Sequence, residues 1–301
     1  MTPTSSAIVI CTVGNPALTA CIESLCLQSR RPDVVMIVTG GPPSALVAAA
    51  VRRLGDAGIE SRVASCAPGL VRQRNLLLPE VTQDVVYFID DDAELAPDYL
   101  ERTLETYDND PGHLIGGVQG VIAEHAYRVP LQLSKLFRRA FMLTETTGTG
   151  RLKSSGHPSF KGSVTAVTDV DVILGCAMSF RRTALGDGFD RAFEERWWGD
   201  DFTMSYAVSR KFRVVQIPGA VFWHKPGHSR PDKDFSVARM QVVNRWYVHQ
   251  KYLEGRSKTA FLWASVGEFV QGLFYLMRGR PGVLRGVVAG WRDLAGARGR
   301  E

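Results

Sequence analysis

Cysteine is sparse in this sequence. There are five cysteines, an odd number, and no CxxC pair. Most lie in apolar surroundings, which favours buried free thiols and a reducing compartment. No signal peptide is expected, because Met1 to Ser6 has no basic region followed by an apolar run, and we therefore expect a cytoplasmic protein. The cysteines are Cys11, Cys21, Cys26, Cys66 and Cys176.

The sequence also lacks any internal repeat and any extreme of composition. Of its 301 residues, 45% are hydrophobic and 22% charged, which is ordinary for a globular protein. The net charge of +5 is a mild excess that suits nucleotide phosphates, nucleic acid or an anionic membrane equally. Nucleic acid is disfavoured, because the basic residues do not cluster with aromatics along one element.

Short apolar runs alternate with helix-like stretches over the first half of the chain. Ala7 to Val13 predicts a buried strand, and Asn15-Pro16 after it is typical of a helix start. This alternation predicts an α/β fold with a mostly parallel sheet covered on both faces. Strands are expected at 7–13, 34–39, 59–64 and 85–89, and helices at 16–28, 46–54 and 70–78.

The pattern changes after about residue 113. The stretch 144–163 is rich in Gly, Ser and Thr, and we interpret it as a mobile loop. We place one α/β domain at 1–230, with halves of about 1–125 and 126–230, and a helical extension at 231–301. Strands are expected at 114–123, 170–179 and 212–217, and helices at 131–143 and 200–210.

The C-terminal extension contains an apolar stripe. Its members recur at steps of four and three, with Glu268 and Gln271 on the other side. A central carboxylate argues against a membrane span, since it costs about 2.5–3.5 kcal/mol on insertion scales. The stripe and the arginine-rich tail suit a helix on an anionic membrane surface, and packing on the chain or on a second subunit stays an alternative. The stripe is Leu262, Val266, Phe269, Leu273 and Leu276.

Three adjacent carboxylates, Asp90, Asp91 and Asp92, end the predicted strand at 85–89. In open α/β sheets, ligands bind beyond the carboxyl ends of the strands. Neighbouring carboxylates repel one another, and a hard cation such as Mg²⁺ or Mn²⁺ would relieve that repulsion. A solvated turn before the next helix is the alternative.

Two tryptophans stand beside two acids in Trp197-Trp198-Gly199-Asp200-Asp201. Aromatic faces stack on sugar rings, and a desolvated carboxylate nearby can act as a general base. The alternative is that the tryptophans are core and the acids cap a helix.

Gly69 opens a predicted helix whose first turns carry Arg72, Arg74 and Asn75. Helix starts and arginines both favour phosphate, although a solvated basic face would show the same pattern. Farther on, His224 follows the strand at 212–217. Imidazole is a frequent metal ligand, and a lone histidine is more often structural unless it is taken with the aspartates.

The order and spacing of these segments resemble the family 2 glycosyltransferases, enzymes of the GT-A fold, over about Ala7 to Pro226. Gly69 to Asn75 is similar to the family's glycine-to-Ala-Arg-Asn helix, and Phe88 to Asp92 to its Asp-X-Asp motif. Gly175 to Arg182 is similar to the acceptor-side strand. Gly188-Phe189-Asp190 followed by Asp200-Asp201 is similar to Gly-Phe-Asp followed by Glu-Asp.

The resemblance implies an inverting transferase that uses a nucleotide-sugar donor, a divalent cation (Mn²⁺ or Mg²⁺) and a glycan, lipid-linked or small-molecule acceptor. By the match, Asp201 is the general base, and Asp92 and His224 hold the metal with Asp90 as a further candidate. Trp197, Trp198, Gly199 and Asp200 are expected at the acceptor. The expected donor residues are Thr12, Asn15, Thr39, Arg72, Arg74, Asn75, Asp90 and Asp91.

The sequence departs from the family pattern in two places. Members usually carry Val-Asp-Asp-Gly-Ser after the second strand, whereas this chain has Val38-Thr39-Gly40-Gly41-Pro42, so the contact to the nucleobase must differ. The usual Glu-Asp pair is Asp200-Asp201. Two rival functions are a non-catalytic carbohydrate-binding homologue and a sugar-nucleotide pyrophosphorylase. The second would need a basic loop after the first strand, which Cys11 to Asn15 lacks.

Overall fold

The computed structural model describes residues 3–123, 132–194, 198–225 and 233–298. The chain divides into two compact units. We call Met1–Arg128, Lys161–Glu195 and Asp200–Pro226 the N-terminal unit, and Val129–Phe160, Arg196–Gly199 and Gly227–Glu301 the C-terminal unit.

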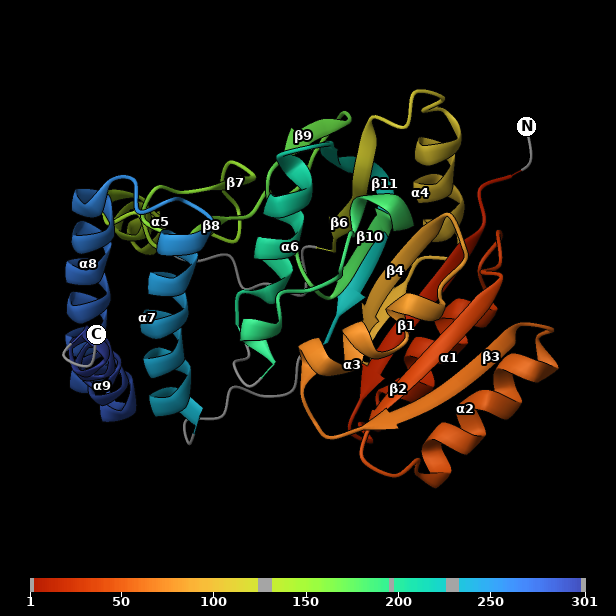
Figure 1. The fold of residues 1–301 in the computed structure, drawn as a ribbon, viewed down its shortest axis with the longest axis horizontal. Helices are drawn as coiled ribbons and strands as arrows, with labels where there is room; N and C mark the ends of the chain where they lie inside the picture. The colour runs from red at the N-terminus through yellow and green to blue at the C-terminus, as the bar shows by residue number, and fades with distance from the viewer. Residues whose placement is uncertain (1–2, 124–131, 195–197, 226–232, 299–301) are drawn as a thin grey trace. The chain divides into compact units, whose positions relative to one another are not determined.

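A mixed sheet forms the centre of the N-terminal unit (Figure 1). Its first four strands, in the order β3-β2-β1-β4, are parallel, whereas β10 runs antiparallel between β4 and β6. β11 is parallel to β6, and both β5 and β9 pair antiparallel with β11. The strands are β1 (Ser6–Thr12), β2 (Val34–Gly40), β3 (Glu60–Cys66), β4 (Val85–Asp90), β5 (Ala93–Leu95), β6 (Ile115–Ile122), β9 (Thr168–Val170), β10 (Ala177–Arg181) and β11 (Arg213–His224).

Helices cover both faces of this sheet (Figure 1). α1, α2 and α4 bury apolar side chains in one cluster with alternate strand residues such as Ile8 and Ile10. On the opposite face, α3 contacts β1, β2 and β3, and α6 contacts β6 and β11. The helices are α1 (Leu18–Cys26), α2 (Ala45–Asp56), α3 (Leu70–Leu76), α4 (Tyr99–Asp108) and α6 (Asp200–Ser209), with short 3-10 turns η1 (Leu78–Glu80), η3 (Arg182–Ala184) and η4 (Arg191–Phe193).

The strand register brings several chain segments to one edge of the sheet. Thr12 of β1 lies opposite Thr39 of β2, and Cys11 lies opposite Asp90 of β4. β11 runs in the same direction as β1 to β4 and ends at His224, which pairs with Ala93. The carboxyl ends of β1, β2, β4 and β11 therefore share the edge where ligands bind in open α/β sheets.

The α/β fold with a mostly parallel sheet is confirmed, and two strand boundaries are corrected. The strand expected at 170–179 is split into β9 and β10. Between them, the backbone N–H groups of Ile173, Leu174 and Gly175 donate to side chains of Ser205, Gln119 and Asp201 instead of to a neighbouring strand. Because their backbone N–H groups are already used in this way, these residues cannot extend the hydrogen-bond ladder of a strand.

β11 also differs from the expected strand at 212–217. It continues to His224 through an irregularity between Gln216 and Val221, where Gly219 has a φ of +85°. Glycine tolerates this left-handed backbone at no steric cost. Phe222-Trp223-His224 therefore belongs to the strand itself.

Helices dominate the C-terminal unit. α7 packs along α9 through three glycines of α9 spaced four residues apart, Gly282, Gly286 and Gly290. A Cβ atom at Gly290 would lie 2.8 Å from Cβ of Val242, and one at Gly286 would meet the carbonyl oxygen of Phe235. Glycine therefore permits this close approach of the two helices. The elements are α5 (Gln132–Ala140), β7 (Arg151–Leu152), β8 (Pro158–Ser159), α7 (Asp234–Lys251), α8 (Lys258–Met277) and α9 (Pro281–Arg298).

The stretch 144–163 was expected as an irregular mobile loop, and this is wrong in part. β7 and β8 form a small antiparallel hairpin there, and Ser155, His157 and Ser159 are buried. Arg245 binds this segment: its Nη1 donates to the carbonyl oxygen of Ser155 at 3.1 Å. Burial of a polar segment requires such hydrogen bonds, and a sequence pattern does not reveal partners that lie 90 residues away.

A buried ion pair lies behind the hairpin. Nε and Nη2 of Arg245, which has no exposed surface, donate to the carboxylate of Glu268 at 3.0 and 2.8 Å. Nε2 of His157 lies 3.2 Å from the same carboxylate. Burial alone would raise the pKa of Glu268, but Arg245 and His157 hold it at about 2. Burial lowers the pKa of His157.

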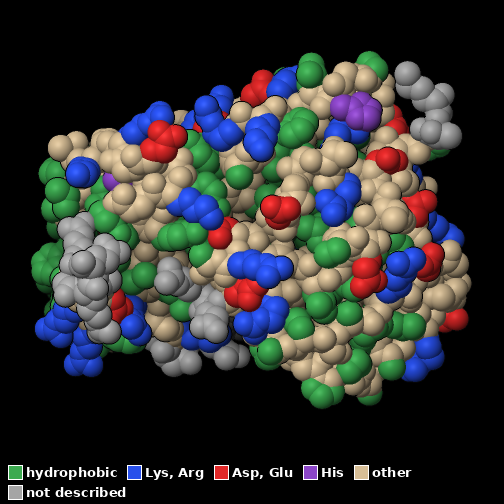
Figure 2. Space-filling model, viewed as in Figure 1, with side chains coloured by type: hydrophobic (Ala, Val, Ile, Leu, Met, Phe, Trp, Pro, Cys, Tyr) green, Lys and Arg blue, Asp and Glu red, His purple; other side chains and the backbone are tan. Residues whose placement is uncertain are grey.

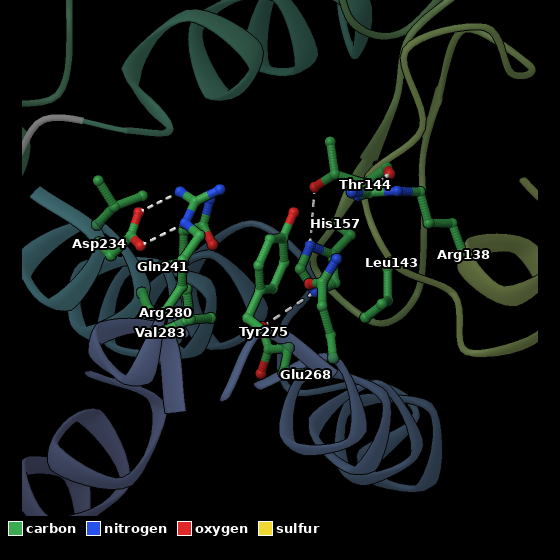
Figure 3. A pocket seen from close by; sticks show the side chains of 13 residues that line it. Arg138, Leu143, Thr144, His157, Asp234, Gln241, Glu268, Tyr275, Arg280 and Val283 are labelled. Atoms are coloured by element: carbon green, nitrogen blue, oxygen red, sulfur yellow. Dashed lines mark hydrogen bonds and ion pairs between the residues drawn. The ribbon is translucent and has the colours of Figure 1, made fainter. Parts of the chain in front are cut away.

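A cavity of about 200 Å³ adjoins this ion pair within the C-terminal unit. Figure 3 shows Arg280 paired with Asp234 on one side, and His157 between Thr144 and Glu268 on the other. Two arginines and two acids line the cavity together, so their charges largely cancel. The lining is Arg138, Leu143, Thr144, His157, Asp234, Val237, Ala238, Gln241, Glu268, Gln271, Tyr275, Arg280 and Val283.

Candidate active site

Three side chains that could hold a metal ion meet at the carboxyl edge of the sheet. Asp90 ends β4, Asp92 follows it in the turn before β5, and His224 ends β11. One potential ligand atom from each lies within 4.8 Å of the other two. Nε2 of His224 is 3.1 Å from Asp92 Oδ1 and 3.9 Å from Asp90 Oδ2. Carboxylate oxygens with one imidazole nitrogen are a donor set that suits Mn²⁺, and the oxygens also suit Mg²⁺.

The backbone between β5 and β11 holds this cluster in place. Ala93 pairs with His224, and the backbone N–H of Lys225 donates to the carbonyl oxygen of Asp92 at 3.1 Å. Burial tends to lower the pKa of His224, but the hydrogen bond to Asp92 and the charge of Asp90 raise it overall. Burial raises the pKa of Asp90, against the lowering effect of Arg74. A cation that bound here would compete with protonation of the imidazole.

Asp91 turns away from the cluster toward the loop after β1. Its Oδ1 accepts from Nδ2 of Asn15 at 3.0 Å, and Oδ1 of Asn15 accepts from the backbone N–H of Ala17 at 3.1 Å. Oγ1 of Thr12 accepts from the backbone N–H of Gly14 at 3.0 Å. Thr12, Asn15 and Asp91, all expected at the donor, thus lie together where β1 and β4 end.

Gln73 of α3 joins the ends of β1 and β2, and the sequence patterns did not single it out. Its buried amide donates to the carbonyl oxygens of Thr12 at 3.1 Å and Val38 at 2.8 Å. A buried amide in the first turn of a helix is a weak signal, because its partners lie on other segments. The helix start is also crowded: a Cβ atom at Gly69 would lie 2.9 Å from the carbonyl oxygen of Glu194.

Arg74 joins the candidate metal cluster to the acids of α6. It is 2% exposed. Its Nη1 donates to Asp200 Oδ2 at 2.6 Å, and its Nη2 donates to Asp90 Oδ1 at 3.2 Å and to the carbonyl oxygen of Gly175 at 3.1 Å. Burial would lower the pKa of Arg74, but Asp200 and Asp90 raise it overall. The guanidinium of Arg74 therefore stays charged and binds two carboxylates that are 110 residues apart in the sequence.

Asp201 lies beside this ion pair at the start of α6. Its Oδ2 accepts from the backbone N–H of Gly175 at 3.0 Å. Burial, together with the negative charge of Asp200, raises the pKa of Asp201 to about 7. A Cβ atom at Gly175 would lie 2.8 Å from Cβ of Asp201, so only glycine leaves room for this carboxylate. A carboxylate with a pKa near neutrality is suited to exchange protons with a substrate.

Asn75, Thr39 and Arg72 complete the expected donor set. Asn75 Nδ2 donates to the carbonyl oxygen of Phe189, whose backbone N–H donates back to Asn75 Oδ1, both at 2.8 Å. The hydroxyl of Thr39 donates to the carbonyl oxygen of Gly41 at 2.6 Å. Arg72 is partly exposed and lies 3.6 Å from Glu194. The amide of Asn75 thus connects α3 to the Gly-Phe-Asp segment.

The expected acceptor residues divide between the two units. Asp200 belongs to the N-terminal unit, Trp198 and Gly199 belong to the C-terminal unit, and Trp197 lies outside the described residues. Trp198 has a φ of +105°, which is rare for a bulky side chain. Asn244 of α7 donates to its carbonyl oxygen at 2.8 Å. Such strain is often found at functional sites.

A match to a protein-family model identifies the family of this chain. Residues 6–189, more than half of the chain, match the model of Glycosyl transferase family 2. The chain belongs to this family. The match includes β1, β4, the Asp90–Asp92 run and α3, and it ends at Phe189, before Asp201 and His224. The expected family and its GT-A-type fold are thereby confirmed.

Solved glycosyltransferase structures share the fold of this family 2 member at low sequence identity. One is the mannosyltransferase PcManGT from Pyrobaculum calidifontis in complex with GDP-Man and Mn²⁺, with 14% identity, a TM-score of 0.57 and coverage of 96% of this chain and 86% of that chain. A second is S. aureus TarS 1–349 in complex with UDP-GlcNAc, with 14% identity, a TM-score of 0.50 and coverage of 96% and 92%.

A longer TarS chain from S. aureus also matches, with 16% identity and a TM-score of 0.50. The match covers 80% of this chain and only 40% of that chain. The chain therefore spans less than half of the length of the longer TarS protein. No curated protein matches the chain.

Proposed function

We propose that this family 2 glycosyltransferase moves a sugar from a nucleotide-diphosphate donor to an acceptor hydroxyl, with inversion at the anomeric carbon. One observation carries the proposal: Arg74 binds both Asp90 of the candidate metal cluster and Asp200, the neighbour of Asp201. This ion pair supports a single site in which a diphosphate and a general base act on the same sugar.

The donor side is supported by the acids at the carboxyl edge of the sheet. Asp92 and His224, with Asp90, would hold Mn²⁺ or Mg²⁺, and their ligand atoms are close enough to share one ion. When bound, the cation acts as a Lewis acid that neutralises the leaving diphosphate. PcManGT was solved with GDP-Man and Mn²⁺, and TarS with UDP-GlcNAc, which makes a nucleotide-sugar the first donor class to test.

The acceptor side needs a base, and Asp201 is our candidate. Its pKa near 7 leaves it ionised in part of the molecules at neutral pH, while its hydrogen bond to Gly175 fixes its orientation. Asp201 would take the proton of the acceptor hydroxyl as that oxygen attacks C1 of the sugar from the side opposite the diphosphate. Such a single displacement inverts the configuration.

Arg74 acts as a positioning residue in this proposal. Because its guanidinium is buried and bound to two carboxylates, it neutralises Asp200 and so limits the repulsion between Asp200 and Asp201. Arg72, which is more exposed, remains our candidate for a phosphate contact. Trp198 remains our candidate for stacking on a glycan, lipid-linked or small-molecule acceptor.

A donor screen tests the proposal. The protein is melted with UDP-, GDP- and dTDP-sugars in the presence of Mn²⁺, because a ligand that binds only the folded state raises the melting temperature by mass action. We expect one nucleotide class to stabilise the protein, and we expect the gain to vanish with EDTA. The stabilising donor is then incubated with the enzyme, and release of nucleoside diphosphate is measured with parent and Asp201→Asn proteins.

Three outcomes are informative. Stabilisation with release by the parent alone supports a transferase with Asp201 as base. Stabilisation that EDTA does not change removes the metal role of Asp92 and His224. Stabilisation without any release of nucleoside diphosphate, even with a panel of saccharide acceptors, favours the alternative function, a carbohydrate-binding protein without transferase activity.

A further inference from the structure

α8 presents a row of apolar side chains to solvent, which we call the apolar face. Phe269 is 45% exposed, Leu262 56% and Met277 78%. Monomeric soluble proteins rarely leave so many large apolar side chains exposed along one element without a partner. The apolar face consists of Leu262, Trp263, Val266, Phe269, Val270, Leu273, Phe274, Leu276 and Met277.

Two leucines of α5 add to this exposed surface. Leu133 is 78% and Leu136 64% exposed. The end of α5 lies against α8, because the rings of Phe141 and Trp263 stack at 4.9 Å and Nε1 of Trp263 donates to the carbonyl oxygen of Ala140 at 2.8 Å. The apolar face is thus widened by a second helix of the same unit.

The charge of the C-terminal unit helps to decide whether a membrane or a second copy of the chain covers the apolar face. The unit holds 19 Lys and Arg against 7 Asp and Glu, a net charge of +12, whereas the N-terminal unit holds 17 against 24, a net charge of −7. Figure 2 shows hydrophobic side chains along the edge occupied by α8, with Lys and Arg side chains gathered nearby at the α9 end.

Several acids of the C-terminal unit are already neutralised by arginines. Glu268 is bound by Arg245, Asp234 by Arg280 and Asp293 by Arg239. In contrast, Lys258, Arg278 and Arg285 are exposed at the ends of α8 and in the neighbouring helix α9. The surface beside the apolar face is therefore strongly positive. Two copies meeting through this face would bring two such charges together, which disfavours a dimer here.

We propose that the apolar face of α8 lies in the surface of an anionic lipid bilayer, with the neighbouring basic side chains on the headgroups. Apolar side chains on one side of a helix and basic residues around it are the properties of helices that lie in the membrane interface. Anionic headgroups supply the negative charge that the C-terminal unit lacks.

The structure favours an α8 that lies in the membrane interface over an α8 that crosses the membrane. By length and composition α8 is long and apolar enough to span a membrane. Its opposite side, however, carries Glu268 in the buried ion pair with Arg245 of α7, and Gly272 against Leu284 of α9. A spanning α8 would have to leave these contacts and expose a carboxylate to hydrocarbon.

Vesicle flotation of the full chain tests the proposal. Phosphatidylcholine vesicles with and without phosphatidylglycerol serve as probes. We expect binding only to the vesicles that contain phosphatidylglycerol, and weaker binding as salt is raised. Phe269→Asp should weaken binding about tenfold or more, because an exposed aromatic side chain that would insert into the bilayer is replaced by a charge. Arg285→Glu should weaken it about fivefold or more.

Matched variants in the N-terminal unit serve as controls. Leu114, which is 61% exposed, is changed to Asp, and the exposed Arg52 of α2 is changed to Glu; both should bind vesicles as the parent does. Melting temperatures of all four variants must equal that of the parent. No binding to anionic vesicles, or equal binding by Phe269→Asp and Leu114→Asp, overturns the proposal.

Self-association is the other outcome to measure. Light scattering of parent and Phe269→Asp shows whether the apolar face holds two copies together. If the parent is a dimer that this substitution dissociates, a second copy covers the face and the membrane proposal is wrong. Neither readout uses sugar transfer, so failure here leaves the proposed function untouched, and a failed donor screen leaves this proposal untouched.

Discussion

Replacing Asp201 by asparagine isolates the proton-accepting role of this side chain. An amide oxygen can still accept from the N–H of Gly175, which the carboxylate binds at 3.0 Å, so the local geometry is retained. What is lost is the ability to take a proton. A positioned general base contributes about 10²–10⁴-fold to a rate, and we expect transfer to fall by that factor while donor binding persists.

The raised pKa adds a pH dependence that belongs to the same group. With a pKa of about 7, Asp201 would be ionised in about a tenth of the molecules at pH 6 and about nine-tenths at pH 8. We expect kcat/KM of the parent to rise about tenfold per pH unit below pH 7 and to level off above it. Because protonation of His224 competes with the cation, Mn²⁺ is kept saturating at every pH.

The stability that Asp201 contributes to the fold changes with pH in the direction opposite to the activity. Because the pKa of Asp201 is raised by folding, its contribution to stability is present at low pH and is lost as the pH rises through about 7. An amide carries no such ionisation. We therefore expect Asp201→Asn to melt at the same or a higher temperature than the parent at pH 8, which separates lost activity from lost folding.

Asp187→Asn is the matched control, since Asp187 is an exposed carboxylate before the Gly188-Phe189-Asp190 segment. It should leave rate, pH profile and melting temperature unchanged. The reasoning is refuted if Asp201→Asn retains turnover within a few-fold of the parent. It is also refuted if the variant keeps the same acidic limb in its pH profile, because that limb would then belong to another group.

Three further changes test the metal cluster, the space beside the base and the buried ion pair. His224→Ala should raise the Mn²⁺ concentration needed for thermal stabilisation by about 10-fold or more, and an unchanged titration would contradict the ligand set. Gly175→Ala should push Asp201 aside and slow transfer by about 10²-fold, with a stability loss of about 1–3 kcal/mol. Arg245→Met should destabilise the protein by about 3–5 kcal/mol in urea unfolding, and adding Glu268→Leu should restore much of that loss.

The order of strands and helices could be predicted from the sequence because apolar runs and turn residues are local signals. β1, β2 and β4 were placed to within one or two residues, and so was the carboxylate run after β4. The helical character of the C-terminal extension and the apolar stripe of α8 were predicted as well, since a helix fixes which residues share a side. The strand boundaries around 171–176 were not, because side chains from other elements take their backbone donors.

The tertiary structure alone decided which charges meet. From the sequence, Arg74 is expected at the donor and Arg245 is only a basic residue in the helical extension. In the structure Arg74 binds Asp90 and Asp200, and Arg245 binds Glu268. It likewise leaves open whether the stripe of α8 is covered, and the structure leaves that stripe exposed while Glu268 is buried. Pairing between distant segments depends on how the sheet and helices pack, and no local pattern of residues encodes which of these segments meet.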